Sequence, residues 1–331
     1  MTFASIIVPA YNAARTLPET IEALLAQTHD SFEIIIINDG STDETIEISN
    51  RYGADEKIRV VHQRNRGLAG ARNSGIHAAA GEFIGFCDAD DIWQPEKLAQ
   101  HIAHLRANPS IGLSYSGSLL IDDLGAPLGQ TQSPKLTRVD TAHVFKRNPI
   151  GNGSAVIVRR DVFRDIAYRP NRAHDRDWYF DETFRQSEDI ECWLRIALTT
   201  NWEFQGIKGH LTQYRINANG LSASIENQLQ AWEQMVEKLQ PLDPDFFAEH
   251  LPAARAYQHR YLCRRALKSL DVTRAHKHAN DWMRSSARPF LEEPLKSAAT
   301  WGALQLMSLC GATAMQRLFT LIASTNRQGA A

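Results

Sequence analysis

Four consecutive isoleucines at positions 34–37, preceded by Glu33, constrain the fold more than any other segment of this 331-residue chain. An unbroken β-branched run is typical of a strand buried on both faces, as in a parallel sheet. Similar runs alternate with helical spacing, so we expect strands at residues 5–8, 33–37, 58–61 and 82–87 and helices at residues 17–25, 42–51 and 67–79. This alternation requires right-handed crossovers and predicts an α/β, Rossmann-like fold with an open, mostly parallel sheet flanked by helices.

Beyond residue 111 the pattern becomes mixed, with strands expected at residues 112–121 and 153–158 and helices at residues 161–166 and 190–198. Residues 169–185 are polar and aromatic without a clear period, which predicts a functional or mobile loop. After about residue 225 the chain reads as almost wholly helical. We therefore expect an α/β domain at residues 1–224 and a helical C-terminal region at residues 225–331.

Composition excludes several classes of function. The net formal charge of −2 gives no case for nucleic acid as a partner. The four cysteines are scattered, which favours a reduced, cytoplasmic compartment. The N-terminus enters a strand without the features of a signal peptide, and no segment is a convincing membrane span. The histidines predict no metal site, and we expect solvated helix positions for His101, His104, His276 and His278.

Polar clusters follow three of the expected strands, at residues 9–12, 38–40 and 88–91. In an open parallel sheet, ligands bind in the crevice beyond the carboxyl ends of the strands. The three clusters come from separate parts of the chain, yet this topology brings them to one edge of the sheet. We therefore expect a ligand site there.

The third cluster contains Asp88, Asp90 and Asp91. Three carboxylates within four positions repel one another unless a cation lies among them. Mg²⁺ or Mn²⁺ suits that role, because both ions prefer oxygen ligands and often share them with a substrate diphosphate. The alternative is a solvated acidic turn that caps the helix expected to begin near residue 95.

An ordered set of motifs resembles the family 2 glycosyltransferases with the GT-A fold. The motifs are SIIVPAYN at residues 5–12, NDGSTD at 38–43, NRG at 65–67, ARNSG at 71–75, DADD at 88–91, FDE at 180–182 and SEDIECWLR at 187–195. The similarity covers about residues 4–225, so residues 1–224 are the expected catalytic domain. It implies an inverting, metal-dependent enzyme that moves a sugar from a nucleotide-sugar donor to a hydroxyl group.

For the donor, the resemblance implies that Asp39 hydrogen-bonds the nucleoside and that Pro9, Ala10, Tyr11 and Asn12 line the same pocket. Asp39 is also suited to an Asx-turn or a helix cap, and both roles are compatible. Arg72 has two readings: a contact with the base or phosphate, or a solvated helix position.

The segment Asp88-Ala89-Asp90 is similar to the D-x-D motif of the family. The resemblance implies that Asp88 faces the ribose or the metal and that Asp90 coordinates Mn²⁺ or Mg²⁺, which bridges the donor phosphates. Asp91 either supports these residues or caps the following helix.

On the acceptor side, the family pattern makes Asp189 the base that takes the proton of the acceptor hydroxyl. The alternative is a helix N-terminal charge that favours the macrodipole, which Glu188 also provides. Asp181, Glu188 and Trp193 are further acceptor-side candidates. With one base and no nucleophile opposite, a single displacement with inversion is expected.

One position departs from the family pattern. Asn217 stands where relatives commonly carry a histidine that approaches the metal or the diphosphate, and an amide is a weaker ligand. The chain also lacks the Q-x-x-R-W signature of processive synthases, which favours single addition.

The helical tail carries nine Lys and Arg residues between positions 255 and 288, with Asp271 and Asp281 as the acidic residues of that stretch. One hypothesis is a basic face that contacts an anionic membrane at its inner face, followed by an apolar stretch at residues 298–323. The other is a bundle that packs on the catalytic domain or on a second copy in a homo-oligomer.

Together these patterns predict a transferase that uses a nucleotide sugar, with a UDP-sugar as the expected donor and a glycan or lipid-linked acceptor of cell-surface polysaccharide biosynthesis. Two rivals remain: a catalytically weak sugar-nucleotide-binding module of the same fold, and a sugar-nucleotide nucleotidyltransferase. The latter class usually has a Gly-rich, basic loop after its first strand, which residues 9–14 do not form.

Overall fold

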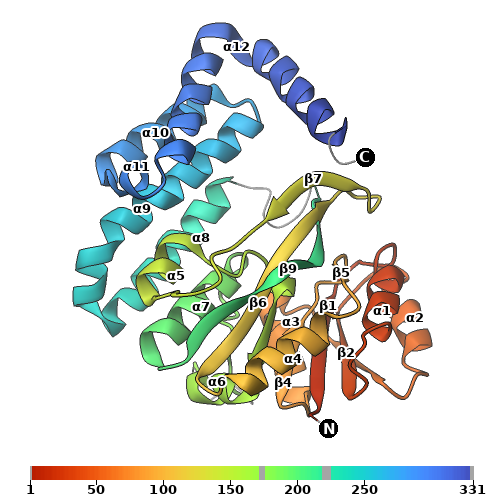
Figure 1. Ribbon diagram of the computed structural model, residues 1–331. Coiled ribbons are helices and arrows are strands. Elements are labelled where there is room, and N and C mark those ends of the chain that lie inside the picture. Colours follow the sequence, from red (N-terminus) through yellow and green to blue (C-terminus); the bar gives the residue numbers. More distant parts are fainter. Residues whose placement is uncertain (1, 171–175, 218–224, 329–331) are drawn as a thin grey trace. The chain divides into compact units, whose positions relative to one another are not determined.

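The computed structural model describes residues 2–170, 176–217 and 225–328, with side chains described as far as residue 311. Two compact units divide the chain: residues 1–141 with 148–218, and residues 142–147 with 219–331. The boundary expected near residue 224 lies outside the described residues. Each unit is considered by itself (Figure 1).

The first unit begins with four parallel strands in the spatial order β3-β2-β1-β4. The strands are β1 (Ala4–Ala10), β2 (Phe32–Asp39), β3 (Ile58–Gln63) and β4 (Phe83–Phe86). The helices between them are α1 (Leu17–Leu25), α2 (Thr45–Tyr52) and α3 (Gly67–Ala78). The predicted α/β alternation is therefore confirmed, with each expected strand and helix present.

The sheet continues beyond β4 in the order β8-β6-β9-β5, with β7 paired to β6. Pairing is parallel between β6 and β9 and antiparallel for β4–β8, β6–β8, β6–β7 and β5–β9. These strands are β5 (Ile92–Trp93), β6 (Ile111–Ile121), β7 (Pro127–Gln132), β8 (Val156–Arg159) and β9 (Glu203–Arg215). The helices of this part are α4 (Lys97–Ala107), α6 (Arg160–Ile166), α7 (Glu188–Thr199) and a 3-10 turn at Gly153–Ala155.

The isoleucine run lies in β2 and is buried on both faces of the sheet. Ile34 and Ile36 join one hydrophobic cluster with Ile6 of β1, while Ile35 and Ile37 are equally buried. An alternating pattern would leave one face of this strand exposed to solvent. The unbroken apolar run is what a central strand with a covering layer on each side requires.

The second unit is helical. It contains α5 (Thr141–Arg147), α8 (Ile225–Leu239), α9 (Pro244–Lys268), α10 (Val272–Ser285), α11 (Arg288–Glu292) and α12 (Pro294–Gln328), with a 3-10 turn at Gln240–Leu242. Leu262 and Ala266 of α9, Ala275 and Ala279 of α10 and Leu304 of α12 share one core. None of the described helices combines the length and apolar character needed to cross a membrane.

Two histidines expected to be solvated are buried, which corrects that prediction. His101 of α4 is fully buried, and its Nδ1 lies 2.7 Å from Ser114 Oγ on β6. His278 of α10 is 4% exposed and faces α9. Helical spacing alone did not reveal which face of each helix packs against a neighbour.

Gly75 permits the close approach of α3 to β1, because a Cβ at this position would overlap the side chain of Ile7. We expect Gly75→Ala to lower the free energy of unfolding by about 1–3 kcal/mol, as overpacking does. The measurement is urea unfolding of the full chain.

The matched control is Gly302→Ala, where a Cβ meets nothing within 4 Å. Stability there should rise or stay unchanged, because Gly is unfavourable inside a helix. Equal effects of the two substitutions would contradict the packing argument.

Candidate active site

The loops after β1, β2 and β4 converge at one edge of the sheet, as the topology of a parallel sheet requires. Asn12 joins the first two loops: its N–H donates to Ser41 Oγ (3.1 Å), and its Oδ1 accepts from the Thr42 N–H (2.8 Å). Asn12 has a φ of 50°, a left-handed conformation that Asn tolerates better than most residues. Two of the predicted clusters are therefore held together by hydrogen bonds.

Asp39 ends β2 with a buried side chain. Its Oδ1 accepts hydrogen bonds from Gln63 Nε2 (2.6 Å) and from the Arg66 N–H (2.9 Å) at the start of α3. These are long-range contacts with β3 and with the start of α3, and not the Asx-turn or helix cap considered from the sequence. Both bonds end on Oδ1, so they are compatible with a contact between Oδ2 and a nucleoside.

The other donor candidates differ in exposure. Pro9 and Ala10 belong to β1 and are buried, and Ala89 packs in the core of the first unit. Tyr11 is 53% exposed at the end of β1. Tyr11 is thus the side chain of this group with a free aromatic face for stacking.

Arg72 is buried, with 2% of its side chain exposed, and it bridges two motifs. One guanidinium nitrogen donates to Asp88 Oδ1 (3.0 Å) and another to Glu188 Oε1 (2.5 Å). Burial lowers the pKa of Arg72, but the two carboxylates outweigh it and raise the pKa above its ordinary value. The solvated alternative for Arg72 is therefore wrong: this cation joins the D-x-D turn to the first turn of α7.

Residues 72–75 of the ARNSG motif on α3 each make a structural contact. Asn73 binds the backbone of Phe180 through Nδ2 (2.8 Å to its O) and Oδ1 (2.9 Å from its N–H). Ser74 donates to Gln63, the same side chain that holds Asp39. With Arg72 bonded to Asp88 and Gly75 packed on β1, α3 connects the loop after β4 with the loop before α7.

Asp90 lies at the centre of the acidic cluster. Its Oδ2 accepts from Asn217 Nδ2 (2.8 Å), so the residue that departs from the family pattern contacts the motif directly. Burial and then repulsion from Asp88 raise the pKa of Asp90 to about 6, and the amide of Asn217 opposes that rise. A nearby cation would stabilise the ionised form of this carboxylate.

The residues present fit a hard divalent ion. Asp88 and Asp90 offer carboxylate oxygens two positions apart, and Mg²⁺ and Mn²⁺ prefer oxygen donors. Asp88 Oδ1 accepts a hydrogen bond from Arg72, and Asp90 Oδ2 accepts one from Asn217. Burial and then repulsion from Asp88 raise the pKa of Asp90, and a bound cation would relieve the repulsion.

Asp91 supports the cluster and does not cap α4, whose N-terminal cap is Glu96. It is fully buried, and its Oδ1 accepts from the Arg215 N–H (3.0 Å). Arg215 also donates through Nε to the Asp90 carbonyl (2.8 Å) and through Nη2 to Glu19 Oε2 (2.6 Å). The end of β9 therefore holds the acidic turn in place.

Glu188 and Asp189 form the first turn of α7. Burial raises the pKa of Glu188 to about 7, although the Arg72 guanidinium opposes it. Burial also raises the pKa of Asp189, again against Arg72. A carboxylate with a raised pKa is a better proton acceptor near neutral pH, which suits a general base.

The remaining acceptor-side candidates are mostly buried. Trp193 is 1% exposed and packs edge-on against Phe180, with ring centroids 5.7 Å apart. Asp181 accepts from the backbone and hydroxyl of Thr183 (2.9 and 2.7 Å). Through these contacts Trp193 and Asp181 stabilise the loop before α7.

Several supporting residues were not singled out from the sequence. Ser154 accepts from the Asp88 N–H (2.9 Å), Glu182 accepts from Arg66 Nε (3.0 Å), and Arg215 binds the acidic turn as described. Glu182 and Arg66 lie in quoted motifs, so the motif order was an available signal for them. Ser154 lies in the 3-10 turn before β8 and Arg215 at the end of β9, and no local pattern specifies where these two segments pack.

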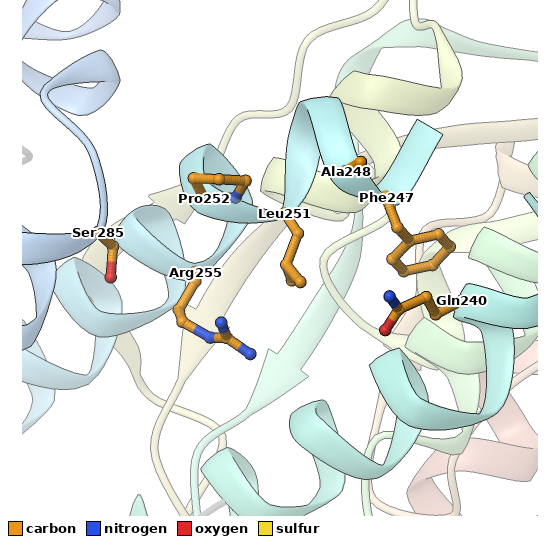
Figure 2. A pocket seen from close by; sticks show the side chains of 7 residues that line it. All are labelled: Gln240, Phe247, Ala248, Leu251, Pro252, Arg255 and Ser285. Carbon is orange, nitrogen blue, oxygen red and sulfur yellow. The ribbon is translucent and has the colours of Figure 1, made fainter. Parts of the chain in front are cut away.

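A pocket of about 280 Å³ lies in the helical unit, between the turn at Gln240 and one side of α9 (Figure 2). Leu251 and Arg255 contribute to its wall, and the Arg255 guanidinium pairs with Glu233 (2.8 Å). Its lining includes none of the motif residues above. It is therefore not part of the candidate active site.

Residues 5–167 match the family model described as "Glycosyl transferase family 2". The glycosyltransferase WfaP of Escherichia coli, a UDP-Glc:alpha-D-GlcNAc-diphosphoundecaprenol beta-1,3-glucosyltransferase, is 31% identical over 68% of this chain and 81% of its own length. TuaG of Bacillus subtilis, a putative teichuronic acid biosynthesis glycosyltransferase, is 30% identical over 66% of this chain and 81% of its own length.

Other curated relatives are matched over less of their length. An uncharacterized glycosyltransferase of Nostoc sp. is 35% identical over 49% of this chain and 52% of that protein. One of Rickettsia felis is 31% identical over 65% of this chain and 33% of that protein. The chain thus spans about half or less of these relatives.

Solved structures share the fold. S. aureus TarS 1–349 in complex with UDP-GlcNAc aligns with a TM-score of 0.56 at 18% identity, over 94% of this chain and 93% of that chain. The mannosyltransferase PcManGT from Pyrobaculum calidifontis, in complex with GDP-Man and Mn²⁺, aligns with a TM-score of 0.54 at 20% identity, over 92% and 86%.

The motif residues, the topology and the relatives agree with the resemblance seen in the sequence. The fold is GT-A, an α/β sheet followed by C-terminal helices. The chain belongs to glycosyltransferase family 2 and is a glycosyltransferase.

Proposed function

We propose that this enzyme transfers a sugar, with inversion, from a UDP-sugar to a hydroxyl group of a glycan or lipid-linked acceptor in cell-surface polysaccharide biosynthesis. The observation that carries the proposal is the buried Arg72, bonded to both Asp88 and Glu188. This contact supports the proposal that residues 88–90 and the Glu188-Asp189 pair belong to one site, the first on the donor side and the second on the acceptor side. A transferase needs both sides within reach of one another.

The relatives support the choice of substrates. WfaP uses UDP-Glc and a diphosphoundecaprenol acceptor, and TarS binds UDP-GlcNAc. PcManGT binds GDP-Man, so the shared fold accepts more than one base, and we choose uridine because WfaP is the nearer in sequence. Family membership favours the transferase over the nucleotidyltransferase and the binding module.

On the donor side, Asp39 and the exposed ring of Tyr11 are proposed to hold the nucleoside, with Pro9, Ala10, Asn12 and Ala89 as the surrounding wall. Asp88 and Asp90 are the proposed ligands of Mn²⁺ or Mg²⁺. When bound, the ion neutralises charge on the diphosphate as it leaves. Arg72 keeps Asp88 oriented and brings a fixed positive charge close to it.

On the acceptor side, Asp189 is the proposed base. The acceptor oxygen attacks the anomeric carbon, the bond from that carbon to the diphosphate oxygen breaks, and the hydroxyl proton passes to an Asp189 oxygen. The nucleoside diphosphate leaves with the electron pair. One base and one displacement invert the configuration. Glu188, Asp181 and Trp193 are proposed to fix the loop and helix that present Asp189.

We also propose residues 1–224 as the catalytic domain and residues 225–331 as a helical appendage. Peripheral membrane contact, homo-oligomer formation and a cytoplasmic location stay predictions from the sequence. The basic face behind the membrane hypothesis is partly neutralised within the helical unit. Ion pairs among the described residues join Arg255 to Glu233, Arg260 to Glu293, Arg274 to Glu226 and Arg288 to Glu292.

We expect Asp189→Asn to reduce kcat by about 100-fold or more, because loss of a general base costs about 10²–10⁴-fold. Affinity for the donor nucleotide should stay within about twofold, since the substitution leaves the donor side intact. Steady-state kinetics and nucleotide titration measure the two effects.

Asp161→Asn, an exposed carboxylate on α6, is the control and should keep full activity. Parallel loss of kcat and of nucleotide binding in Asp189→Asn would contradict its role as the base.

We expect Arg72→Lys to lower kcat/KM by about 100-fold or more, because a Lys ammonium does not reproduce the fork that binds two carboxylates. Both the KM for donor and kcat should change, since Asp88 and Glu188 each lose a partner. Arg59→Lys, at an exposed pair with Glu33, is the matched control. Wild-type kinetics in Arg72→Lys would refute the bridging role.

A further inference from the structure

Two buried histidines meet between α9 and α10 of the helical unit. Nδ1 of His259 on α9 lies 3.2 Å from Nδ1 of His278 on α10, and the ring centroids are 5.4 Å apart. The side chains are 7% and 4% exposed. Helices α9 and α10 pack side by side (Figure 1).

Asp281 completes the group. It follows His278 by three positions, so both side chains lie on the same face of α10. One ligand atom of each of the three residues lies within 4.8 Å of the other two. Among the described residues, this is the group of three or more His, Cys, Asp or Glu side chains whose ligand atoms come together in this way.

The distance between the two nitrogens matches coordination geometry. Two imidazole nitrogens bound to a tetrahedral Zn²⁺, each at about 2.0–2.1 Å, are about 3.3 Å apart. The observed 3.2 Å is therefore a separation that two nitrogens bound to one ion can have. A hydrogen bond between the two rings explains the same spacing, but it leaves the carboxylate of Asp281 without a part in the arrangement.

The protonation state also suits a metal. Burial lowers the pKa of His259 and of His278, so both imidazoles are neutral at neutral pH and each has a lone pair to offer. Asp281 and Glu233 counter the positive charges of Arg255 and Lys277 around His259. Glu226 adds a further negative charge on the side of His278.

We propose that His259, His278 and Asp281 bind one transition-metal dication of the Zn²⁺ class, which clips α9 to α10. Two nitrogens and one carboxylate oxygen are the donor set that Zn²⁺ accepts, and water completes the coordination. The site contains no residue of the D-x-D turn, and it does not depend on the proposed sugar transfer. Its role is to stabilise the helical unit.

The test uses the purified full chain, stripped of metal with a chelator, and Zn²⁺ alone as the probe. Titration calorimetry should give one high-affinity site, and thermal unfolding should shift upward by several degrees with Zn²⁺. Co²⁺ should produce the intense visible absorption of a tetrahedral or five-coordinate site, which an octahedral aqua ion lacks.

Substitutions of the proposed ligands test which side chains bind Zn²⁺. His278→Gln should weaken Zn²⁺ binding by about 100-fold and Asp281→Asn by about 10-fold, because each removes a ligand or its charge. Asp281 is partly exposed, so Asp281→Asn keeps the test valid if His278→Gln fails to fold. The matched control is His276→Gln on the same helix, whose ring is bonded to Ser308 (2.7 Å). It should bind Zn²⁺ as the wild type does.

Asp90→Asn separates this site from the acidic cluster and should leave the Zn²⁺ affinity unchanged. The proposal is overturned if the wild-type protein shows no saturable Zn²⁺ binding. It is equally overturned if His278→Gln and Asp281→Asn bind like His276→Gln, or if Asp90→Asn abolishes the site.

Discussion

The rest of the candidate active site depends on the ion pairs that the buried guanidinium of Arg72 forms with Asp88 and Glu188. A cation removed from water is costly unless carboxylates surround it, and here Asp88 and Glu188 do so. Removing Arg72 would leave both carboxylates without the cation that pairs with them. The same helix also places Asn73 on the backbone of Phe180 and Ser74 on Gln63. The position of α3 therefore fixes how Asp88 lies relative to the first turn of α7, which contains the proposed base Asp189.

Much of this arrangement was predictable, because its parts are local. The isoleucine run of β2 identifies a central strand, and the polar residues after β1, β2 and β4 must meet once those strands are parallel. The contact of Arg72 with Glu188 was not predictable, since 116 positions separate them and no spacing rule links α3 to α7. Strand β9 contains glycines and many polar residues, so its sequence does not predict a strand. Its place beside β6 depends on tertiary pairing.

The departures from expectation also have physical causes. Asn217 lacks the charge of a histidine, yet it contacts Asp90 and partly offsets the rise in its pKa. In the helical unit, a count of charges along the sequence overstated the basic face, because Glu226, Glu233, Glu292 and Glu293 pair with it from outside the counted stretch. His278 is buried because it packs against His259 of α9, a contact that the sequence of α10 alone does not indicate.

The measurement that most directly tests the account is thermal unfolding with UDP, GDP, dTDP and CDP, each with and without Mn²⁺. A ligand at about 100 times its Kd stabilises a protein by about 2.7 kcal/mol, which gives a clear shift in Tm. The account predicts stabilisation by UDP above the other nucleotides, dependent on Mn²⁺ and lost in Asp90→Asn. Stabilisation that is independent of Mn²⁺, or the absence of any response to all four nucleotides, would contradict it.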